Sequence, residues 1–397
     1  MVKRRIGFYE ERTRMFDVII VGAGTAGCVA ARELAEKQGK KVLILEKKNH
    51  IAGNCYDEKD EHGVLIHVYG PHIFHTGKEK VFEYLSRFTD WYHFHHEVVA
   101  NVHGKYVPVP FNLHTLKAVY GEEKGNALEE KLVSIYGMGT KVPILDLMNH
   151  EDDDLKMIGK FVYDNIYVCY TMKQWGKKPE EIDPAVTARV PVNISYDNGY
   201  FADKYQGVPL HGFTPMFEKM VDHENISIEL NVEAKEVLSI KENKVYYKGE
   251  EFVGTVIFTG PIDEFFGCKY GRLPYRTLHF DFEYYEQDDY QGHAVVNYTV
   301  DQDYTRITEY KYLTGQKCEG TTISKEYPSA YTGEDGQIPY YSIANAKNHA
   351  LYDKYKEEVS QIGNFYLLGR LAEYQYYNID VMVEKAMELA EKLGERN

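Results

Sequence analysis

The chain has 397 residues, of which 44% are hydrophobic and 27% charged, a composition typical of a folded protein with about two or three domains. Its formal net charge of −15 argues against general nucleic-acid binding, which requires a cationic surface. Five scattered cysteines without a Cys-x-x-Cys pair predict a reducing compartment and no structural zinc, and no apolar run reaches membrane length.

Residues 1–14 are rich in charge and contain no apolar stretch, so we predict no signal peptide and expect a cytoplasmic protein. A phosphate-binding fingerprint follows. The β-branched run Val18–Val21 predicts a strand buried on both faces, and Gly22, Gly24 and Gly27 come directly after it. These glycines allow a tight turn, close approach of a pyrophosphate, and close packing of the next helix, whose N-terminus faces the phosphates.

A second strand, Lys41–Glu46, ends in an acid that can accept hydrogen bonds from a ribose hydroxyl, which completes a predicted dinucleotide site. The next segment, Lys47–Tyr56, resembles the one with which flavoprotein oxidases continue around their cofactor. Near the C-terminus, a strand ending in Gly369 and Arg370 and a helix over Asn378–Gly394 predict a second approach to a flavin. A pure NAD enzyme needs no such return, so the sequence favours FAD.

The rest of the chain alternates between helical and strand-rich regions. We expect a loop region up to about residue 78, mainly helical structure over residues 113–183, and antiparallel strands in Val190–Tyr200 and Tyr275–Tyr312. Helices are also predicted at Glu79–Phe88 and Phe213–His223, and strand-like alternation at Tyr92–Val109. Short strands that rejoin the nucleotide-binding domain are predicted at Ile226–Leu230, Glu236–Ile240, Lys244–Lys248 and Thr255–Thr259.

Two polar clusters have simple interpretations. His93, His95 and His96 lie in strand-like alternation without accompanying carboxylates, so we predict no metal site. The acidic run Glu151–Asp154 is typical of a solvated loop or of the start of a helix.

Aromatic and basic residues gather between Tyr170 and Gln206. Tyr170, Trp175 and Tyr200 offer stacking faces with polar edges, and Arg189 offers a planar fork of donors to phosphate oxygens. Such a set suits a base, a diphosphate and a sugar ring. The residues alone fit an amphipathic helix followed by a tyrosine-rich strand equally well.

Further motifs run in order over residues 15–390. They are Tyr69–Thr76, Tyr170–Gly176, Arg189–Val192, Asn198–Phe201, Tyr205–Gly207, Thr259–Asp263, Tyr275–Arg276, Tyr304–Glu309, Lys325–Tyr327, Pro339–Tyr341 and Gly369–Leu371. Together with the glycine fingerprint, these motifs resemble those of the bacterial UDP-galactopyranose mutase family.

The resemblance implies an isomerase that interconverts UDP-galactopyranose and UDP-galactofuranose without net redox change and supplies galactofuranose for cell-surface glycans. In the family, N5 of reduced FAD attacks the anomeric carbon, and the galactosyl adduct recloses its ring before UDP recaptures it. The resemblance also implies UDP-galactose as substrate, a homodimer, and an external reductant such as NAD(P)H. It implies neither nucleic-acid binding nor membrane insertion.

Family position implies roles for individual residues. Arg189, on a mobile lid, and Arg306 clamp the diphosphate, and strand alternation predicts Tyr304 on the same face as Arg306. The implied catalytic residues are Arg189, Arg306, His75 and Arg370. The implied substrate contacts are Tyr170, Trp175, Arg189, Tyr200, Arg306, Tyr341, Tyr376 and Asn378. The implied cofactor contacts are Gly22, Gly24, Thr25, Ala26, Gly27, Glu46, Lys47, Asn54, His72, Ile73, His75, Gly369, Arg370, Tyr376, Asn378 and Ile379, and no metal is expected.

The implied fold is α/β, with a Rossmann-like FAD-binding domain, an inserted helical domain and an antiparallel β-sheet domain. We expect a discontinuous FAD-binding domain in residues 15–91, 208–262 and 340–397. The helical domain with its lid is expected in residues 113–185, and the sheet domain in residues 92–112, 186–207 and 263–339. Residues 1–14 form a tail.

Three positions depart from the family pattern. Asn378 replaces a usual aspartate near the phosphates, which either tightens diphosphate binding or weakens a hydrogen bond. His96 stands where an asparagine near flavin and sugar is common, and Ala52 replaces a glycine. Three other functions stay open: an amine-oxidase-type oxidoreductase, a non-catalytic nucleotide-sugar binding protein, and a mutase for an N-acetylated or pentose UDP-sugar.

Overall fold

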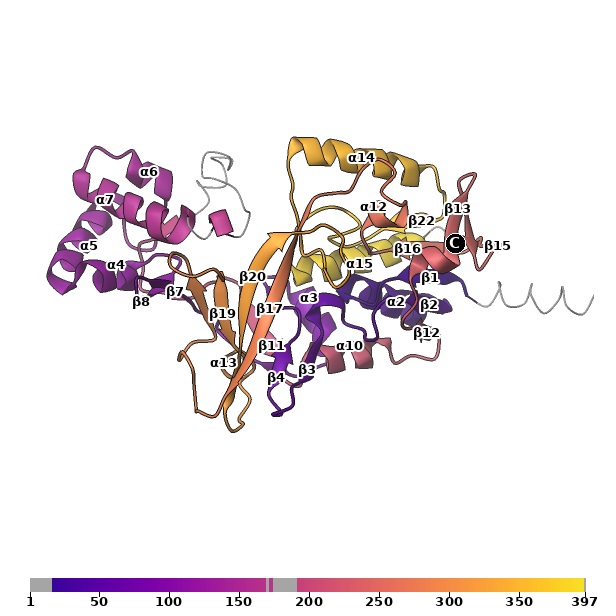
Figure 1. The fold of residues 1–397 in the computed structure, drawn as a ribbon, viewed down its shortest axis with the longest axis horizontal. Coiled ribbons are helices and arrows are strands. Elements are labelled where there is room, and N and C mark those ends of the chain that lie inside the picture. Colours follow the sequence, from indigo (N-terminus) through magenta and orange to yellow (C-terminus); the bar gives the residue numbers. More distant parts are fainter. Residues whose placement is uncertain (1–15, 169–170, 174–190, 396–397) are drawn as a thin grey trace, which may run out of the picture.

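The structure is a computed structural model, and it describes residues 16–168, 171–173 and 191–395. Three parts lie in a row: a parallel sheet flanked by helices, a central antiparallel sheet, and a group of helices at the far end (Figure 1). Within the described residues, no helix is both long enough and apolar enough to cross a bilayer.

A five-stranded parallel sheet forms the first part, in the order β12-β2-β1-β16-β22. Apart from Thr255, its three central strands of four residues each are apolar, as expected where both faces are covered. The strands are β1 (Val18–Val21), β2 (Val42–Leu45), β12 (Ile226–Glu229), β16 (Thr255–Phe258) and β22 (Phe365–Leu367). They come from three separate stretches of the chain.

Two hydrophobic cores pack against the two faces of this sheet. Val18 and Ile20 belong to a core with the buried faces of α2, α3, α10 and α15, whereas Ile19 and Val21 belong to a core with aromatic residues of α14. The helices are α2 (Thr25–Gln38), α3 (Glu79–Ser86), α10 (Phe213–Val221), α14 (Ala346–Ser360) and α15 (Ile379–Gly394). α14 was not predicted from the sequence.

Two of the strands predicted to rejoin the nucleotide-binding domain pack against a core of the parallel sheet but do not pair with its strands. Residues Ala234–Val237 form the short helix α11, so the strand predicted at Glu236–Ile240 begins later, at Leu238. A separate antiparallel sheet contains β13 (Leu238–Lys241), β14 (Lys244–Tyr247) and β15 (Glu250–Glu251). Buried and exposed side chains alternate along β13, where Leu238 is buried and Ser239 is exposed. This pattern suits a sheet that is covered on one face only.

A seven-stranded sheet forms the middle part, in the order β21-β17-β20-β19-β18-β7-β8. Its pairs are antiparallel except for β18 with β7, which run parallel. The strands are β7 (Val98–Val102), β8 (Lys105–Val109), β17 (Tyr275–Tyr285), β18 (Val295–Tyr298), β19 (Arg306–Glu309), β20 (Thr321–Ala330) and β21 (Tyr341–Ser342). The region Tyr275–Tyr312 thus contains the predicted strands, but its end enters the short helix α13 (Tyr310–Thr314).

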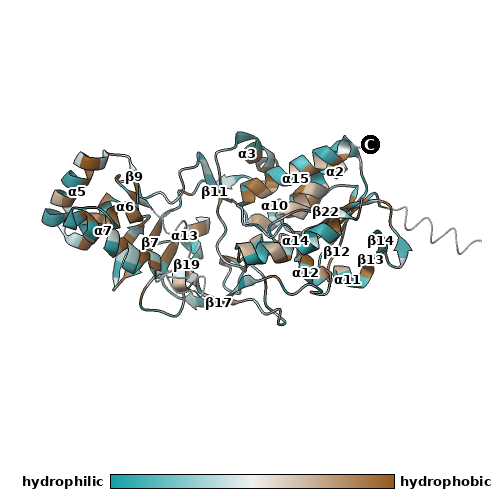
Figure 2. Ribbon diagram, turned by 90° about the horizontal axis from the view of Figure 1, so that it is seen from above, coloured by the Kyte–Doolittle hydropathy of each residue, from teal (hydrophilic) through white to brown (hydrophobic). Residues whose placement is uncertain are grey.

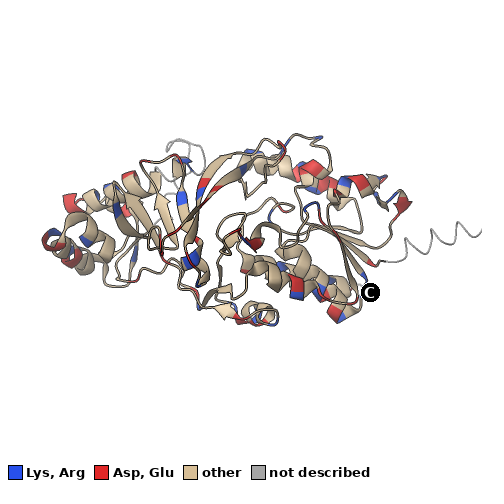
Figure 3. Ribbon diagram, turned by 60° about the horizontal axis from the view of Figure 1, so that its bottom comes forward, with Lys and Arg blue, Asp and Glu red and all other residues tan. Residues whose placement is uncertain are grey.

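The far group is helical. It contains α4 (Leu113–Tyr120), α5 (Glu122–Tyr136), α6 (Ile144–Met148), α7 (Asp153–Val162) and the π-helical turn η2 (Tyr163–Val168). Asp152 caps α7 by accepting from the N–H groups of Asp154 and Leu155, so the acidic run is the start of a helix. Apolar and polar residues alternate around α5 and α7 (Figure 2), and basic and acidic residues are intermixed along the ribbon (Figure 3).

The stretch predicted as a loop up to residue 78 contains regular structure. It includes the short helix η1 (Gly53–Cys55), the hairpin β3 (Asp57–Lys59) and β4 (Leu65–His67), and β5 (Phe74–Thr76). β11 (Tyr205–Pro209) pairs with β5 and with β6 (Trp91–Tyr92). Conversely, within the described part of the predicted strand Val190–Tyr200, residues 191–200, only Pro191–Asn193 (β10) forms a strand, paired with β9 (Lys141–Pro143). The short helix α12 (Ile262–Phe265) follows β16.

Candidate active site

A cavity of about 1000 Å³ runs from the carboxyl ends of β1, β2 and β16 to one face of the seven-stranded sheet. Open α/β sheets bind ligands at this edge, because the strand ends and helix N-termini leave a crevice there. The cavity is large enough for a dinucleotide and a second ligand. Its two ends are built in different ways.

Close backbone packing forms the first end. Gly22 has a φ of 102°, and a Cβ added there would lie 2.1 Å from Thr259 Oγ1. A Cβ on Gly27 would lie 1.9 Å from the carbonyl oxygen of Gly22. These positions therefore require glycine, and they set the N-terminus of α2 against the end of β1. The resulting cradle of backbone N–H groups suits the diphosphate of a dinucleotide cofactor.

Glu46 closes this end at the tip of β2. Its Oε2 accepts from the N–H of Ala23 at 2.7 Å, and its Oε1 accepts from the N–H of Lys48 at 2.9 Å. The side chain is buried and lines the cavity. Backbone bonds therefore fix the carboxylate, which retains lone pairs for the hydroxyl groups of a ribose.

Lys48 is a cavity residue that the sequence analysis did not identify. Its Nζ is buried without a hydrogen-bond partner among the described residues and lies 3.7 Å above the ring of Tyr69. Burial lowers the pKa of this ammonium group to about 8. Tyr69 in turn is held by His50, whose Nε2 lies 2.7 Å from the tyrosine hydroxyl. A buried cation in such a place suits an anionic group of the bound cofactor.

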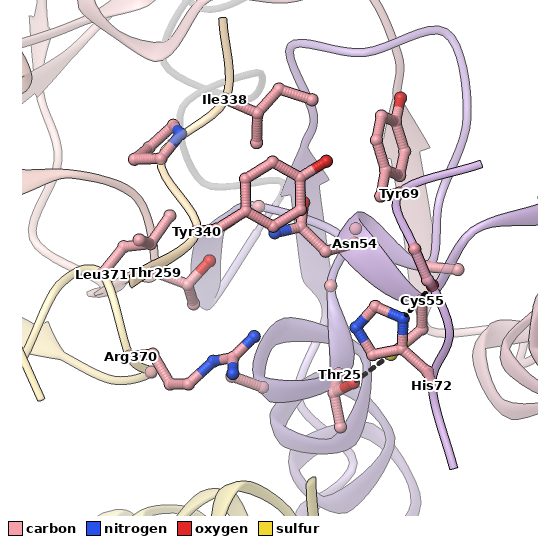
Figure 4. Close-up of a pocket in the computed structure, with 18 of the residues that line it drawn as sticks. Thr25, Asn54, Cys55, Tyr69, His72, Thr259, Ile338, Tyr340, Arg370 and Leu371 are labelled. Atoms are coloured by element: carbon pink, nitrogen blue, oxygen red, sulfur yellow. Dashed lines mark hydrogen bonds between the residues drawn. The ribbon is translucent and has the colours of Figure 1, made fainter. Parts of the chain in front are cut away.

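The middle of the cavity lies between η1 and the end of β22. His72 faces the side chain of Arg370 across this space, with Thr25 and Cys55 between them (Figure 4). Burial lowers the pKa of His72 to about 3, so its imidazole is neutral, and its Nδ1 bonds to the carbonyl oxygen of Gly70 at 2.8 Å. Arg370 follows Gly369, whose φ is 102°. One cation and one neutral imidazole, whose Nδ1 donates to Gly70 and whose Nε2 is therefore an acceptor, thus border the middle of the cavity.

The second end is a row of side chains on the seven-stranded sheet. Asn297, Arg306 and Glu326 lie opposite one another on neighbouring strands β18, β19 and β20, and all three line the cavity. Arg306 Nε lies 3.8 Å from the buried carboxylate of Glu326. Tyr341 and Tyr376 also reach the cavity, with ring centroids 5.9 Å apart. Guanidinium and phenol groups together offer donors to a diphosphate.

Tyr304 does not share the face of Arg306, so that prediction is wrong. β19 begins only at Arg306, and the ring of Tyr304 packs against Tyr298 and Tyr327. These two tyrosines neighbour Asn297 and Glu326 along their strands and therefore point to the opposite side of the sheet.

Histidines border the second end from β5 and from the segment before β7. His75 Nδ1 lies 2.7 Å from Asp203 Oδ2, and the imidazole stacks on Phe201 at 3.6 Å. His96 is buried, and its Nδ1 has no partner among the described residues. Burial, followed by the nearby charge of Arg306, lowers the pKa of His96 to about 3. The site therefore holds a second neutral imidazole.

Most predicted site residues within the described ranges meet in this one cavity. It is lined by Gly22, Gly24, Thr25, Ala26, Glu46, Lys47, Asn54, His72, Ile73, His75, Tyr200, Arg306, Tyr341, Gly369, Arg370, Tyr376, Asn378 and Ile379. Gly27 lies behind the lining, where it packs α2 on β1. Tyr170, Trp175 and Arg189 lie outside the described residues. Prediction missed Lys48, Asn297 and Glu326 as lining residues. For Asn297 and Glu326, alternation within β18 and β20 indicates only the face of the strand, and strand pairing places them beside Arg306.

Comparisons with known proteins agree with this geometry. A family model for UDP-galactopyranose mutase matches residues 165–376, and one for NAD(P)-binding Rossmann-like domains matches residues 20–88. A probable UDP-galactopyranose mutase of Klebsiella pneumoniae is 39% identical over 95% of this chain and 94% of its own length. The chain belongs to the UDP-galactopyranose mutase family. Within the family, a dTDP-fucopyranose mutase of Escherichia coli is 38% identical over 95% of this chain and 98% of its own.

The family assignment confirms the predicted isomerase class and the predicted fold class. A solved reduced UDP-galactopyranose mutase has the same fold, with a TM-score of 0.65 and 14% identity over 96% of this chain and 94% of that one. Flavin-containing amine oxidase A of cattle matches over only 15% of this chain and 11% of its own length, at 37% identity. The oxidase likeness is therefore one of flavin-binding fold, and the family assignment implies a flavin cofactor.

Proposed function

We propose that the protein interconverts UDP-galactopyranose and UDP-galactofuranose on reduced FAD, with no net redox change. One observation carries the proposal. A single cavity joins the glycine cradle at Gly22 to a row of polar side chains around Arg306, so that a dinucleotide and a nucleotide sugar can meet there. Membership of the mutase family supports the choice of reaction.

The cofactor would be held mainly by backbone groups. The residues present fit FAD because Gly22 and Gly27 leave no room for a Cβ and so keep the backbone of α2 and β1 close together, and because Glu46 and Lys48 place an acceptor and a buried cation beside this cradle. When bound and reduced, FAD supplies the nucleophile, N5, that retains the anomeric carbon while the sugar ring opens and recloses. Arg370 and the neutral His72, which face each other across the cavity, would border the flavin ring.

The substrate would be held mainly by side chains. Arg306 binds the diphosphate, and the hydroxyl groups of Tyr341 and Tyr376 add donors. Family position adds Arg189 to this clamp and places Tyr170 and Trp175 at the uridine and sugar. Because Asn378 carries no charge, it does not repel the phosphates as an aspartate would. Enclosure by these groups would exclude water from the reacting carbon.

A second candidate has its own support. The dTDP-fucopyranose mutase of Escherichia coli matches this chain over nearly its whole length, at an identity close to that of the Klebsiella relative. A dTDP-sugar differs from a UDP-sugar in the base and ribose, and fucose lacks the hydroxyl at C6. We therefore propose dTDP-fucopyranose as the alternative substrate, which would undergo the same ring contraction.

One parallel assay tests both. The purified protein is reduced with dithionite and incubated with UDP-galactofuranose or with dTDP-fucofuranose, and the products are separated by chromatography. We expect pyranose product from the UDP-sugar and no product without reductant. Product from the dTDP-sugar alone selects the second candidate. UDP binding without any conversion indicates a binding protein, and steady oxygen consumption with an amine substrate indicates an oxidase.

Three accompanying features belong to the same proposal. A homodimer, NAD(P)H as the external reductant, and a cytoplasmic supply of galactofuranose for surface glycans all rest on family likeness. Light scattering of the holoenzyme tests the dimer. Bleaching of the flavin absorbance by NADH or NADPH under argon tests the reductant.

A further inference from the structure

We infer that Glu373 positions Tyr376 for the diphosphate of the nucleotide ligand, although Glu373 itself does not line the cavity. The inference rests on the proposed function and deepens it, because it names a residue that neither the sequence motifs nor the family comparison assigns. It follows from the way in which one carboxylate joins two arms of a single loop.

The loop between β22 and α15 reaches the cavity twice. Its first arm, Gly369–Leu371, lines the middle of the cavity, and its second arm contributes Tyr376 and Asn378. Between the arms the chain turns away from the cavity, and Ala372 and Tyr374 are fully buried in the core that also contains the aromatic residues of α14. The separation of the two arms therefore depends on contacts outside the cavity.

Glu373 joins the two arms. Its Oε2 accepts from the backbone N–H of Gly369 in the first arm at 3.1 Å, and the hydroxyl of Tyr377 in the second arm donates to the same oxygen. Its Oε1 accepts from Nζ of Lys385, on α15, at 2.7 Å. Hydrogen bonds to an ionised acceptor are stronger than those between neutral groups. One side chain thus fixes both the separation of the arms and their place beside α15.

Tyr377 is a stable donor in this arrangement. Its side chain is buried, and burial followed by the hydrogen bond to Glu373 raises its pKa, so the phenol keeps its proton at neutral pH. The neighbouring Tyr376 is 56% exposed and lines the cavity. Its ring centroid lies 5.4 Å from Arg370 Cζ and 5.9 Å from the ring of Tyr341. Because Tyr376 is so exposed, its position depends on the backbone that Tyr377 holds.

The other site residues of the loop have anchors of their own. Arg370 follows β22, whose pairing with β16 fixes the chain at this point. Asn378 directly precedes α15, where the N–H of Met382 donates to its carbonyl oxygen at 3.1 Å. Tyr376 is therefore the site residue of this loop that depends most on the bond between the two arms.

The test measures UDP binding to the holoenzyme, which requires no turnover. In Glu373→Ala we expect the Kd for UDP to rise about tenfold, a typical value for the loss of one hydrogen bond to a charged group. The Kd for FAD, from titration of the apoprotein, should stay at the wild-type value, because the glycine cradle and the end of β22 are unchanged. General damage to the fold would weaken both.

Three further variants separate the joined arms from the ion pair. Tyr377→Phe removes the donor of the second arm and should raise the Kd for UDP as Glu373→Ala does, although Tyr377 does not line the cavity. Lys385→Met is the matched control: it removes the ion pair, leaves the arms joined and should keep the wild-type Kd. Glu373→Gln should bind UDP more tightly than Glu373→Ala, because one amide oxygen can accept from both donors.

A double variant tests whether Glu373 acts through Tyr376. Glu373→Ala combined with Tyr376→Phe should bind UDP no more weakly than Tyr376→Phe alone, because the hydroxyl that Glu373 positions is already absent. If Glu373→Ala does not fold, Tyr377→Phe replaces it in this comparison.

Two results would overturn the inference. The first is a wild-type Kd for UDP in both Glu373→Ala and Tyr377→Phe, even with a lower Tm, which would make Glu373 a residue of stability only. The second is a double variant that binds UDP more weakly than Tyr376→Phe by the full Glu373 factor. A wild-type holoenzyme that binds neither UDP nor dTDP is a failure of the proposed function instead, so the two failures are distinguishable.

Discussion

The two ends of the cavity are built on different principles. The cofactor end is made from backbone, over a few consecutive residues around Gly22 and Gly27, and its shape depends on the lack of side chains. The substrate end is made from side chains that project from separate, neighbouring strands, such as Asn297, Arg306 and Glu326. Adding a single carbon atom to one of these glycines should therefore disrupt the cofactor end. Removing a single charged side chain, such as that of Arg306, should disrupt the substrate end.

The largest expected effect is at Gly27. In Gly27→Ala, the new Cβ would lie 1.9 Å from the carbonyl oxygen of Gly22, so α2 must move away from β1. Overpacking of this kind costs on the order of 1–3 kcal/mol and would spoil the phosphate cradle as well. We expect a lower Tm and little bound flavin, measured by absorbance per protein.

Gly363→Ala provides the control, because no atom lies within 4 Å of an added Cβ there. It should keep both the Tm and the flavin content. If Gly27→Ala were purified with a full complement of flavin, the cofactor end would not depend on close backbone packing, and the contrast between the two ends would fail.

Arg306→Ala tests the substrate end. It removes a charged donor, and the loss of such hydrogen bonds costs about 1.5–3 kcal/mol, or roughly 10- to 150-fold in kcat/KM. Flavin content should not change, since Arg306 lies on the seven-stranded sheet and not in the glycine cradle. Arg306→Lys should fall between, because lysine keeps the charge but loses the planar fork. Unchanged kcat/KM in Arg306→Ala would remove it from the clamp.

The same difference explains how far the sequence could predict the site. The glycines and Glu46 were predictable because their spacing repeats a rule of strand, turn and helix within about thirty residues. The substrate end depends on which strands become neighbours, and local pattern does not determine this. Asn297 lay in a region predicted as strands and Glu326 in a motif without an assigned role, and only the pairing of β18, β19 and β20 places them beside Arg306. The roles of His75 and Arg306 came from family likeness.

Errors in the predicted fold have the same origin. β3 and β5 contain polar residues such as Asp57 and His75, which looked like loop, although pairing with β4 and β11 makes them strands. β13 and β14 were predicted as strands, but their pairing in a small antiparallel sheet of their own could not be predicted from local pattern. Long apolar or periodic segments, such as β1, α2 and α15, formed as predicted because their burial pattern is complete within the segment.

Lys48 is the exception at the cofactor end, because it contributes a charge and not a shape. The pKa of its ammonium group is about 8, so this group loses its charge as the pH rises through that value. A bound anion interacts favourably only with the protonated, charged form. Flavin affinity should therefore be full below pH 8 and fall as the pH rises through this value. We expect Lys48→Met to weaken flavin binding about tenfold, a typical value for one charged hydrogen bond, and to abolish this pH dependence. Lys48→Arg should keep the affinity and shift the decline to higher pH.

Titration of the apoprotein with FAD at pH 7 and pH 9 checks both points. Equal pH dependence in wild type and Lys48→Met would show that Lys48 does not face an anion. Salt should weaken binding less than it does for an exposed lysine, because Lys48 is buried.

The smallest expected effect is at His96, and it distinguishes charge from polarity at the substrate end. The neutral imidazole has one donor and one acceptor, and Nδ1 is buried without a partner among the described residues. A neutral hydrogen bond to a sugar hydroxyl is worth about 0.5–1.5 kcal/mol, so its loss in His96→Phe should lower kcat/KM by roughly 2- to 13-fold. His96→Asn keeps a donor and an acceptor and should lose less. Phenylalanine can keep the ring contacts with Tyr200 and Phe201, so a larger loss in His96→Asn than in His96→Phe would show that His96 acts through packing alone.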